Sequence, residues 1–172
     1  SHNIGTTNAY RMLGPVGGTL VLLLDILKGT LSASLPILFG IDHHWLILVV
    51  GLAAVLGHTF SIYIGFKGGK AVATSAGILL AYNPPFFFIA FAIWFSLILL
   101  TSMVSVASTL GMVIITCWSL VYHDWLLTTV ACGLLVVFFI KHRANFKRIK
   151  AGDENMVPFG LGLYLRNQRH HD

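Results

Sequence analysis

Long apolar runs separated by short polar segments dominate this chain. Residues 13–39 and 45–64 form the first two runs, and residues 125–140 form the last. A helix needs about 20 mostly apolar residues to cross the ~30 Å hydrocarbon core of a bilayer. Each of these runs therefore predicts a membrane-spanning helix, and the pattern as a whole predicts an all-α, polytopic helical membrane protein.

The middle of the chain contains shorter apolar runs, and their number decides how many helices cross the membrane. Residues 71–82 are apolar but fall short of a full span, and Asn83-Pro84-Pro85 then breaks the run. Proline restricts the residue before it and has no amide hydrogen to donate, so a helix is expected to end there. Further runs cover residues 86–100 and 104–122. The chain is thus expected to hold about six transmembrane helices within a single domain, residues 1–172.

Composition agrees with this class. Hydrophobic residues make up 56% of the chain and charged residues only 10%, which is too little charge for the surface of a soluble domain of this size. The net charge of +5 suits loops beside an anionic leaflet. The sequence shows no basic face with stacking aromatics, so it does not indicate binding to nucleic acid. Cys117 and Cys132 lie inside apolar runs, where we expect buried thiols without a disulfide or zinc site.

Basic residues indicate which polar segments face the cytoplasm. The loop with Lys67 and Lys70 and the basic segment after Ile140 should both be cytoplasmic. An even number of crossings must separate them, so the turn at Pro84 is expected to reverse the chain at the outer face. The segment around Asp42 then lies outside. Four polar segments are expected on the cytoplasmic side: about 1–12, 65–71, 101–108 and 141–172.

The segment Lys67-Gly68-Gly69-Lys70 is the strongest candidate for anion binding. Its glycines allow backbone amides to approach an anion closely, and its lysines add positive charge. The apolar run from residue 71 is expected to be helical, so its positive dipole end would face the same place. The combination suits a phosphate at the membrane surface. The alternative is a basic loop that only fixes topology.

Other polar residues near or inside the spans leave two interpretations open. Asp25 and Lys28 stand three residues apart and share a helix face, either as a structural ion pair or as an outer wall of an active site. His58 lies close to the lysine segment and is either a packing residue or a substrate contact. Adjacent His43 and His44 are interpreted as solvated loop residues, and no metal site is predicted.

The predicted topology brings Arg11, Lys67, Lys70, His142 and Arg148 to one face, together with serine, threonine and asparagine side chains. Such a set predicts a site for a phosphorylated ligand beside lipid, because topology alone needs no amides or hydroxyls.

Three segments, in order and at matching spacing, resemble the motifs of the acyl-phosphate-dependent glycerol-3-phosphate acyltransferases (the PlsY family). They are residues 1–11, residues 57–74 and residues 142–154. The residues that carry the resemblance are Ser1-His2-Asn3-Ile4-Gly5-Thr6-Thr7-Asn8 with Arg11, Gly57-His58 with Phe66-Lys67-Gly68-Gly69-Lys70-Ala71-Val72-Ala73-Thr74, and His142, Asn145, Arg148 with Gly152-Asp153-Glu154. Asp25, Lys28-Gly29 and the segment Val104-Ser105-Val106-Ala107-Ser108 also fit. His2 and Ala71 depart from the family, since many members have glycine there.

The resemblance implies an integral membrane enzyme of bacterial phospholipid synthesis, with its active site on the cytoplasmic side of the cell (inner) membrane. Such an enzyme transfers an acyl group from acyl phosphate to the sn-1 hydroxyl of glycerol 3-phosphate, giving 1-acylglycerol 3-phosphate (lysophosphatidic acid) and phosphate. It needs no metal or other cofactor. A soluble phosphate acyltransferase makes the acyl phosphate, and membrane lipid is the other expected partner. The family has one more membrane helix before the first motif, so this chain is expected to lack it.

The resemblance also assigns roles to individual residues. The catalytic candidates are Ser1, Arg11, Lys70, His58 and Asn145. The substrate-binding candidates are Asn3, Thr7, Asn8, Lys67, Gly68, Gly69, Ser105, Ser108, His142 and Arg148. The proton of the attacking hydroxyl is expected to go to the donor phosphate itself, to His58 or to His142.

Two functions from other classes stay open on the residues alone. A transporter or channel for an organic phosphate would also place cations at a membrane site, although its polar residues should continue to the outer face. The outer loops here are short and nearly uncharged. A noncatalytic membrane scaffold would leave the gathering of polar segments without a purpose.

Overall fold

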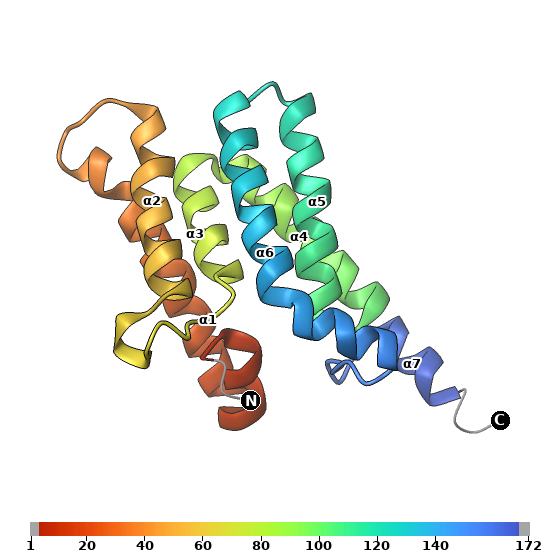
Figure 1. Cartoon of the computed structure of the whole chain (residues 1–172). Coiled ribbons are helices and arrows are strands. Elements are labelled where there is room, and N and C mark those ends of the chain that lie inside the picture. Colours follow the sequence, from red (N-terminus) through yellow and green to blue (C-terminus); the bar gives the residue numbers. More distant parts are fainter. Residues whose placement is uncertain (1–3, 169–172) are drawn as a thin grey trace. The chain divides into compact units, whose positions relative to one another are not determined.

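The computed structural model describes residues 4–168, and these residues form helices and loops without a β-strand (Figure 1). The chain divides into two compact units, one ending at Phe88 and one beginning at Ile89. The prediction of an all-α protein is therefore confirmed.

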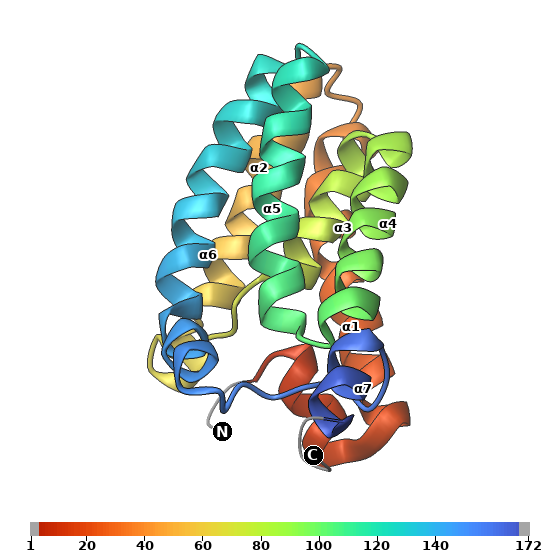
Figure 2. The ribbon, with the colours of Figure 1, turned by 90° about the vertical axis from the view of Figure 1, so that its right-hand side faces the viewer.

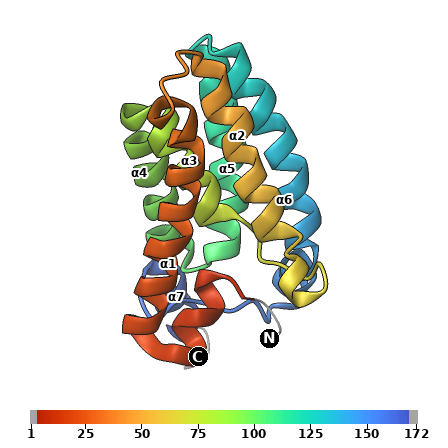
Figure 3. The same ribbon diagram turned by 90° about the vertical axis from the view of Figure 1, so that its left-hand side faces the viewer.

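The first unit is built on three helices that pack against one another: α1 (Thr6–Leu38), α2 (His44–Thr59) and α3 (Val72–Tyr82). Figure 3 shows them side by side. Helix α1 consists of two helical pieces joined at a kink, where Gly14 has φ 74° and ψ −174°. Glycine tolerates this positive φ, and Pro15 follows it directly. The polar segment before residue 12 reads from its composition as a loop, but its residues 6–11 are helical.

Small residues let these three helices approach closely. A side chain on Gly29 of α1 would overlap the Thr74 carbonyl of α3, and one on Gly77 would overlap the Ile26 carbonyl. The hydroxyl of Thr30 donates to the Gly77 carbonyl at 3.0 Å. Close backbone approach through small residues is the usual basis of helix association in membranes, where apolar burial gives no advantage over lipid.

Between α2 and α3 the chain makes a 3₁₀ turn, η1 (Ile62–Ile64), and then an extended segment. Within the predicted span over residues 45–64, the α-helix therefore stops at Thr59. Ala71 precedes α3 in the left-handed conformation, with φ 57°. This geometry favours glycine, so Ala71 adopts a backbone conformation that residues with a side chain rarely take.

Helix α4 (Pro84–Thr101) begins in the first unit and continues in the second. Its start confirms a break at Asn83, whose side-chain oxygen accepts a hydrogen bond from the Phe86 amide at 3.0 Å. Asparagine at this position caps the new helix by satisfying an amide that lacks a partner within the first turn. The expected reversal of the chain at the outer face stays a prediction.

The second unit contains α5 (Val104–Val121) and α6 (Trp125–Ala151), which pack against each other. In Figure 2, α5 stands between α6 and α4. Asp124 caps α6 by accepting from the Leu127 amide at 2.9 Å. Polar contacts join the helices, including one of 2.8 Å between the Ser119 and Thr128 hydroxyls.

Helix α6 does not stop at the end of the apolar run. It continues without interruption from the predicted span, residues 125–140, through the basic segment to Ala151. Gly152 then ends it in the left-handed conformation, with φ 77°. His142, Asn145 and Arg148 consequently fall three residues apart on one helix face.

The tail folds back onto the end of α4. The Ser102 hydroxyl accepts from the Leu163 amide at 2.9 Å, and its carbonyl accepts from the Val157 amide at 2.8 Å. Leu163 belongs to the short helix α7 (Leu161–Gln168), which the sequence did not reveal.

Five helices among the described residues are long and apolar enough to cross a membrane, and α3 is a shorter apolar helix. This agrees with the predicted count of about six. Cys117 and Cys132 are free thiols, as expected, but both are exposed. The prediction that they are buried was wrong, because an apolar run in a membrane helix can face lipid as well as protein.

Candidate functional site

In the first unit, the ion pair between Asp25 and Lys28 is in contact with His58, the histidine of the second motif. The Lys28 ammonium lies 2.6 Å from Asp25 Oδ1 and contacts His58 Nδ1. Asp25 Oδ1 lies 3.6 Å from the same ring nitrogen. Asp25 and His58 are buried, whereas 41% of the Lys28 side chain is exposed. Charges within a membrane span are costly unless paired, so this pairing explains how Asp25 is tolerated.

The kink in α1 brings the first motif to this cluster. The Thr6 hydroxyl donates to Asp25 Oδ2 at 3.3 Å, although the two residues are 19 positions apart. The Tyr10 ring covers Gly18, and its hydroxyl lies 2.9 Å from the Thr19 hydroxyl. We call Thr6, Asp25, Lys28 and His58 the histidine cluster. Thr6 was not among the predicted site residues; its only signal was its place inside the first motif.

The two glycines of the second motif lie against His58. The Gly69 amide donates to the His58 carbonyl at 3.1 Å. A Cβ atom on Gly68 would overlap that carbonyl, and one on Gly69 would overlap Nε2 of the ring. Neither glycine has a positive φ, so close packing on α2, and not backbone strain, requires them here.

The lysines of this segment differ in environment. Lys67 is exposed, and Lys70 is half-buried and has an interaction partner. Helix α3 begins two residues after Lys70, which confirms the predicted helix start beside the lysine segment.

The first motif is described only in part. Ser1 and Asn3, both predicted to contact substrate, lie outside the described residues. Thr7 and Asn8 are half-buried in the first turns of α1, and Arg11 is exposed.

The second unit holds a separate cluster around one buried carboxylate, that of Glu154. Its Oε1 accepts from the Ser105 hydroxyl at 2.9 Å and from the Asn145 amide at 2.6 Å. Its Oε2 pairs with Arg148 Nε at 2.9 Å. We call these four residues the glutamate cluster. It joins the start of α5, the basic end of α6 and the loop after α6.

Three of these four residues were predicted to bind substrate or act in catalysis, but Glu154 was not. Glu154 stands in the third motif, beside residues that can donate hydrogen bonds. A carboxylate that is buried needs several such partners, and this requirement could have indicated its role. A single carboxylate that satisfies three donors fixes the side chains of Ser105, Asn145 and Arg148 in place. Arg148 binds Glu154 through Nε, and 40% of its side chain is exposed.

His142 and Ser108 are also buried in this unit. His142 Nδ1 lies 2.9 Å from the Phe138 carbonyl. A carbonyl only accepts, so Nδ1 carries the ring proton in this contact. The Ser108 hydroxyl accepts from the Trp94 indole at 3.2 Å, a contact that joins α4 to α5.

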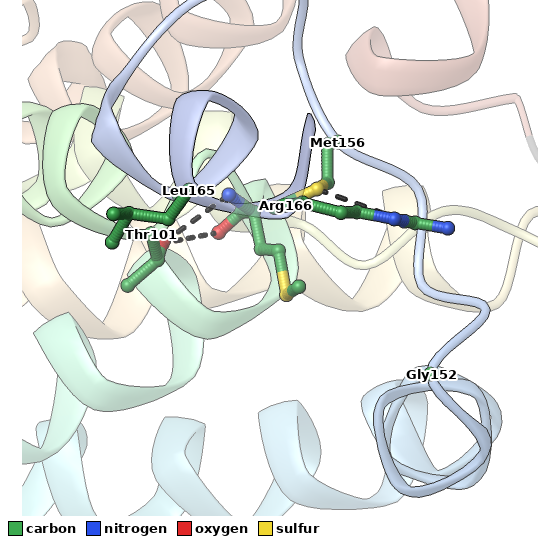
Figure 4. Close-up of a pocket in the computed structure, with 7 residues that line it drawn as sticks. Thr101, Gly152, Met156, Leu165 and Arg166 are labelled. Carbon is green, nitrogen blue, oxygen red and sulfur yellow. Dashed lines mark hydrogen bonds between the residues drawn. The ribbon is translucent and has the colours of Figure 1, made fainter. Parts of the chain in front are cut away.

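A cavity of about 410 Å³ also lies in the second unit, between the end of α4 and the tail (Figure 4). Its lining includes Thr101 and Met103 and, from α7, Leu165 and Arg166. None of the predicted site residues that the structure describes borders it. Within residues 4–168, no group of three or more His, Cys, Asp or Glu side chains is placed to hold a metal ion.

Comparison with known proteins gives a consistent result. The sequence model of a family described as glycerol-3-phosphate acyltransferase matches residues 1–152. A glycerol-3-phosphate acyltransferase of Lacticaseibacillus casei is 90% identical, over 98% of this chain and 82% of the relative. One of Latilactobacillus sakei is 63% identical, over 94% of this chain and 78% of the relative.

Two solved structures are also similar. One is a crystal structure of PlsY (YgiH), an integral membrane glycerol 3-phosphate acyltransferase, in its glycerol 3-phosphate form. It is 34% identical with a TM-score of 0.83, over 91% of this chain and 79% of that one. The other is the lysophosphatidic acid form, with a TM-score of 0.80 at 35% identity, over 90% and 79% of the two chains. On these matches, the chain belongs to the glycerol-3-phosphate acyltransferase family and is an integral membrane protein.

Proposed function

We propose that this protein transfers an acyl group from acyl phosphate to the sn-1 hydroxyl of glycerol 3-phosphate, releasing inorganic phosphate and 1-acylglycerol 3-phosphate. The observation that carries the proposal is the match to PlsY, which is described in a glycerol 3-phosphate form and in a lysophosphatidic acid form. A substrate and a product that differ by one acyl group fit this reaction.

The donor groups in each unit support the proposal. Beside the histidine cluster, Lys67 and Lys70 flank the paired glycines. In the glutamate cluster, the amide of Asn145 and the guanidinium of Arg148 are held by one carboxylate. Cations and amides of this kind suit phosphate groups, and arginine can bind phosphate through two parallel hydrogen bonds.

We assign the residue roles that the motifs imply. Ser1, Arg11, His58, Lys70 and Asn145 act on the reacting groups. The residues that hold the two phosphorylated substrates are Asn3, Thr7, Asn8, Lys67, Gly68, Gly69, Ser105, Ser108, His142 and Arg148.

The chemistry is a direct displacement. The glycerol oxygen attacks the acyl carbonyl carbon, the bond from that carbon to the phosphate oxygen breaks, and the phosphate leaves. Phosphate is a good leaving group, so no acyl-enzyme intermediate is needed. The hydroxyl proton passes to the donor phosphate, and fixed cationic and amide donors stabilise the negative charge that develops in the transition state.

The reaction takes place on the cytoplasmic side of the bacterial cell membrane, where the basic segments lie under the positive-inside rule. The acyl tail of the donor remains in the bilayer or between helices. A soluble phosphate acyltransferase supplies the acyl phosphate.

The test is to incubate the purified protein in detergent or lipid with palmitoyl phosphate and labelled glycerol 3-phosphate. Lysophosphatidic acid should form from palmitoyl phosphate, and not from palmitoyl-CoA or palmitoyl acyl carrier protein. Labelled glycerol 3-phosphate that accumulates inside proteoliposomes without being acylated would instead support a transporter. Failure of both assays with folded protein would contradict the proposal.

A further inference from the structure

We propose that Asp25 and Lys28 are positioning residues, which hold His58 neutral with its ring proton on Nε2. His58 then acts as a hydrogen-bond donor beside the Gly68-Gly69 segment and not as a general base. The donor role rests on the function proposed above, whereas the protonation of the ring does not depend on it.

The contact at Nδ1 decides the position of the proton. Lys28 Nζ is in contact with His58 Nδ1 and lies 2.6 Å from Asp25 Oδ1. An ammonium group has three donor hydrogens and no lone pair. His58 Nδ1 must therefore supply the lone pair in this contact, which leaves the proton of the neutral ring on Nε2.

Charge balance leads to the same state. Asp25 and Lys28 together are neutral, and both lie in the membrane-spanning helix α1. A protonated His58 would point an Nδ1 hydrogen at the Lys28 ammonium and would place a second positive charge directly against the first. Like charges in contact at low dielectric are strongly unfavourable. Asp25 lies 3.6 Å from Nδ1, too far for a hydrogen bond that would replace the lysine contact.

The opposite side of the ring faces the second motif. A Cβ atom on Gly69 would overlap Nε2, so the glycine backbone lies directly beside this nitrogen. The Gly69 amide is hydrogen-bonded to the His58 carbonyl, so the ring and the segment are fixed to each other. An Nε2 hydrogen at this place adds a neutral donor to the backbone and lysine donors of the segment.

His142 has the opposite arrangement. Its Nδ1 donates to the Phe138 carbonyl, which makes Nε2 the acceptor in the neutral ring. Of the two histidines, only His142 thus has an Nε2 lone pair that can take up a proton. The histidine cluster therefore binds and orients, and a proton accepted by an imidazole would go to His142.

Two substitutions of His58 separate a donor from a base. The amide nitrogen of glutamine can take the place of Nε2 and donate, but it cannot accept a proton at neutral pH. We expect His58→Gln to keep kcat within about tenfold of the parent protein, a loss below about 1.4 kcal/mol. The shorter amide of asparagine takes the place of Nδ1, so His58→Asn has no donor where Nε2 was. Its KM for glycerol 3-phosphate should therefore rise well above that of His58→Gln. Equal loss of kcat in both variants, with KM unchanged, would overturn the donor role.

The ring proton can be observed without any activity. In protein labelled with ¹⁵N at histidine, the signals of His58 are assigned by their loss in His58→Gln. We expect a protonated Nε2 and an unprotonated Nδ1 in the parent protein at neutral pH. Lys28→Met should give a mixture of tautomers or a protonated ring, while Lys67→Met, at an exposed lysine, should leave the His58 signals unchanged. A proton on Nδ1 of the parent protein would refute the proposal, whether or not the protein is an acyltransferase.

Discussion

The carboxylate of Glu154 accepts a hydrogen bond from the Asn145 amide at 2.6 Å. The two residues are nine positions apart, on either side of the glycine that ends α6. The same carboxylate holds Ser105 and Arg148. The sequence suggested that these residues contact substrate independently. In the folded chain, the carboxylate of Glu154 holds all three donor side chains in place.

Removal of that acid should destabilise the second unit. In Glu154→Ala, the buried groups of Ser105 and Asn145 lose their acceptor, and an unsatisfied buried polar group costs about 1–3 kcal/mol. The ion pair adds little, because Arg148 is partly exposed. We expect the free energy of unfolding to fall by about 3 kcal/mol. Thermal melting in detergent measures this, and Asp153→Ala, at an exposed neighbour, should melt like the parent. Equal melting of the two variants would show that Glu154 does not organise the cluster.

Lys70 is expected to be essential for turnover but not for folding. It is half-buried in the segment before α3, where a positive charge can stabilise a phosphate. Lys70→Ala should lower kcat/KM by at least about 100-fold while the melting temperature stays near that of the parent. Lys67→Ala, at an exposed lysine, should cost only a few-fold and depend on salt. Near-parental rates for Lys70→Ala would remove this residue from the site.

Gly68 is expected not to tolerate a side chain. In Gly68→Ala the new methyl group would overlap the His58 carbonyl, so the segment must move off α2. We expect KM for glycerol 3-phosphate to rise by about tenfold or more, which corresponds to a loss of about 1.4 kcal/mol in binding. Gly133→Ala, where nothing lies within 4 Å of the new atom, is the matched control and should keep its kinetics. A normal KM for Gly68→Ala would contradict the close packing.

Ser102 is expected to hold the tail in place. In Ser102→Ala the Leu163 amide loses its acceptor, at a cost of about 1–2 kcal/mol. Trypsin should then cleave at Arg166 faster than in the parent or in Ser96→Ala, at an exposed serine of α4. Intact mass spectrometry over a digestion time course measures the difference. Identical digestion of the two variants would mean that other contacts hold α7.

Topology can be tested with single cysteines in a background without Cys117 and Cys132. Exposed positions 4, 67 and 147 should all react with impermeant reagents from the cytoplasmic side, and position 42 from the outside. Labelling of intact cells and of inverted vesicles distinguishes the two sides. If any of the first three positions reacted from outside, the polar segments could not serve one cytoplasmic reaction.

Much of the helical framework could be predicted from the sequence. The break at Asn83, the start of the helix after Ala71 and the span that begins at Trp125 all appear where the apolar pattern and proline placed them. These features depend on local composition, which a sequence displays directly. The helical first turns before Gly14 and the uninterrupted course of α6 through its basic end were missed, because polar and basic residues are compatible with both helix and loop.

The sequence by itself determined that the chain enters a membrane, where its helices break, and which residue types carry its chemistry. The reason is that hydrophobic length and backbone restrictions act locally along the chain. Only the tertiary structure decided which partners those residues have: that Lys28 contacts His58 across 30 positions, and that Ser105 binds Glu154 across 49. Buried polar groups must satisfy one another wherever the fold brings them together, and no local pattern encodes that pairing.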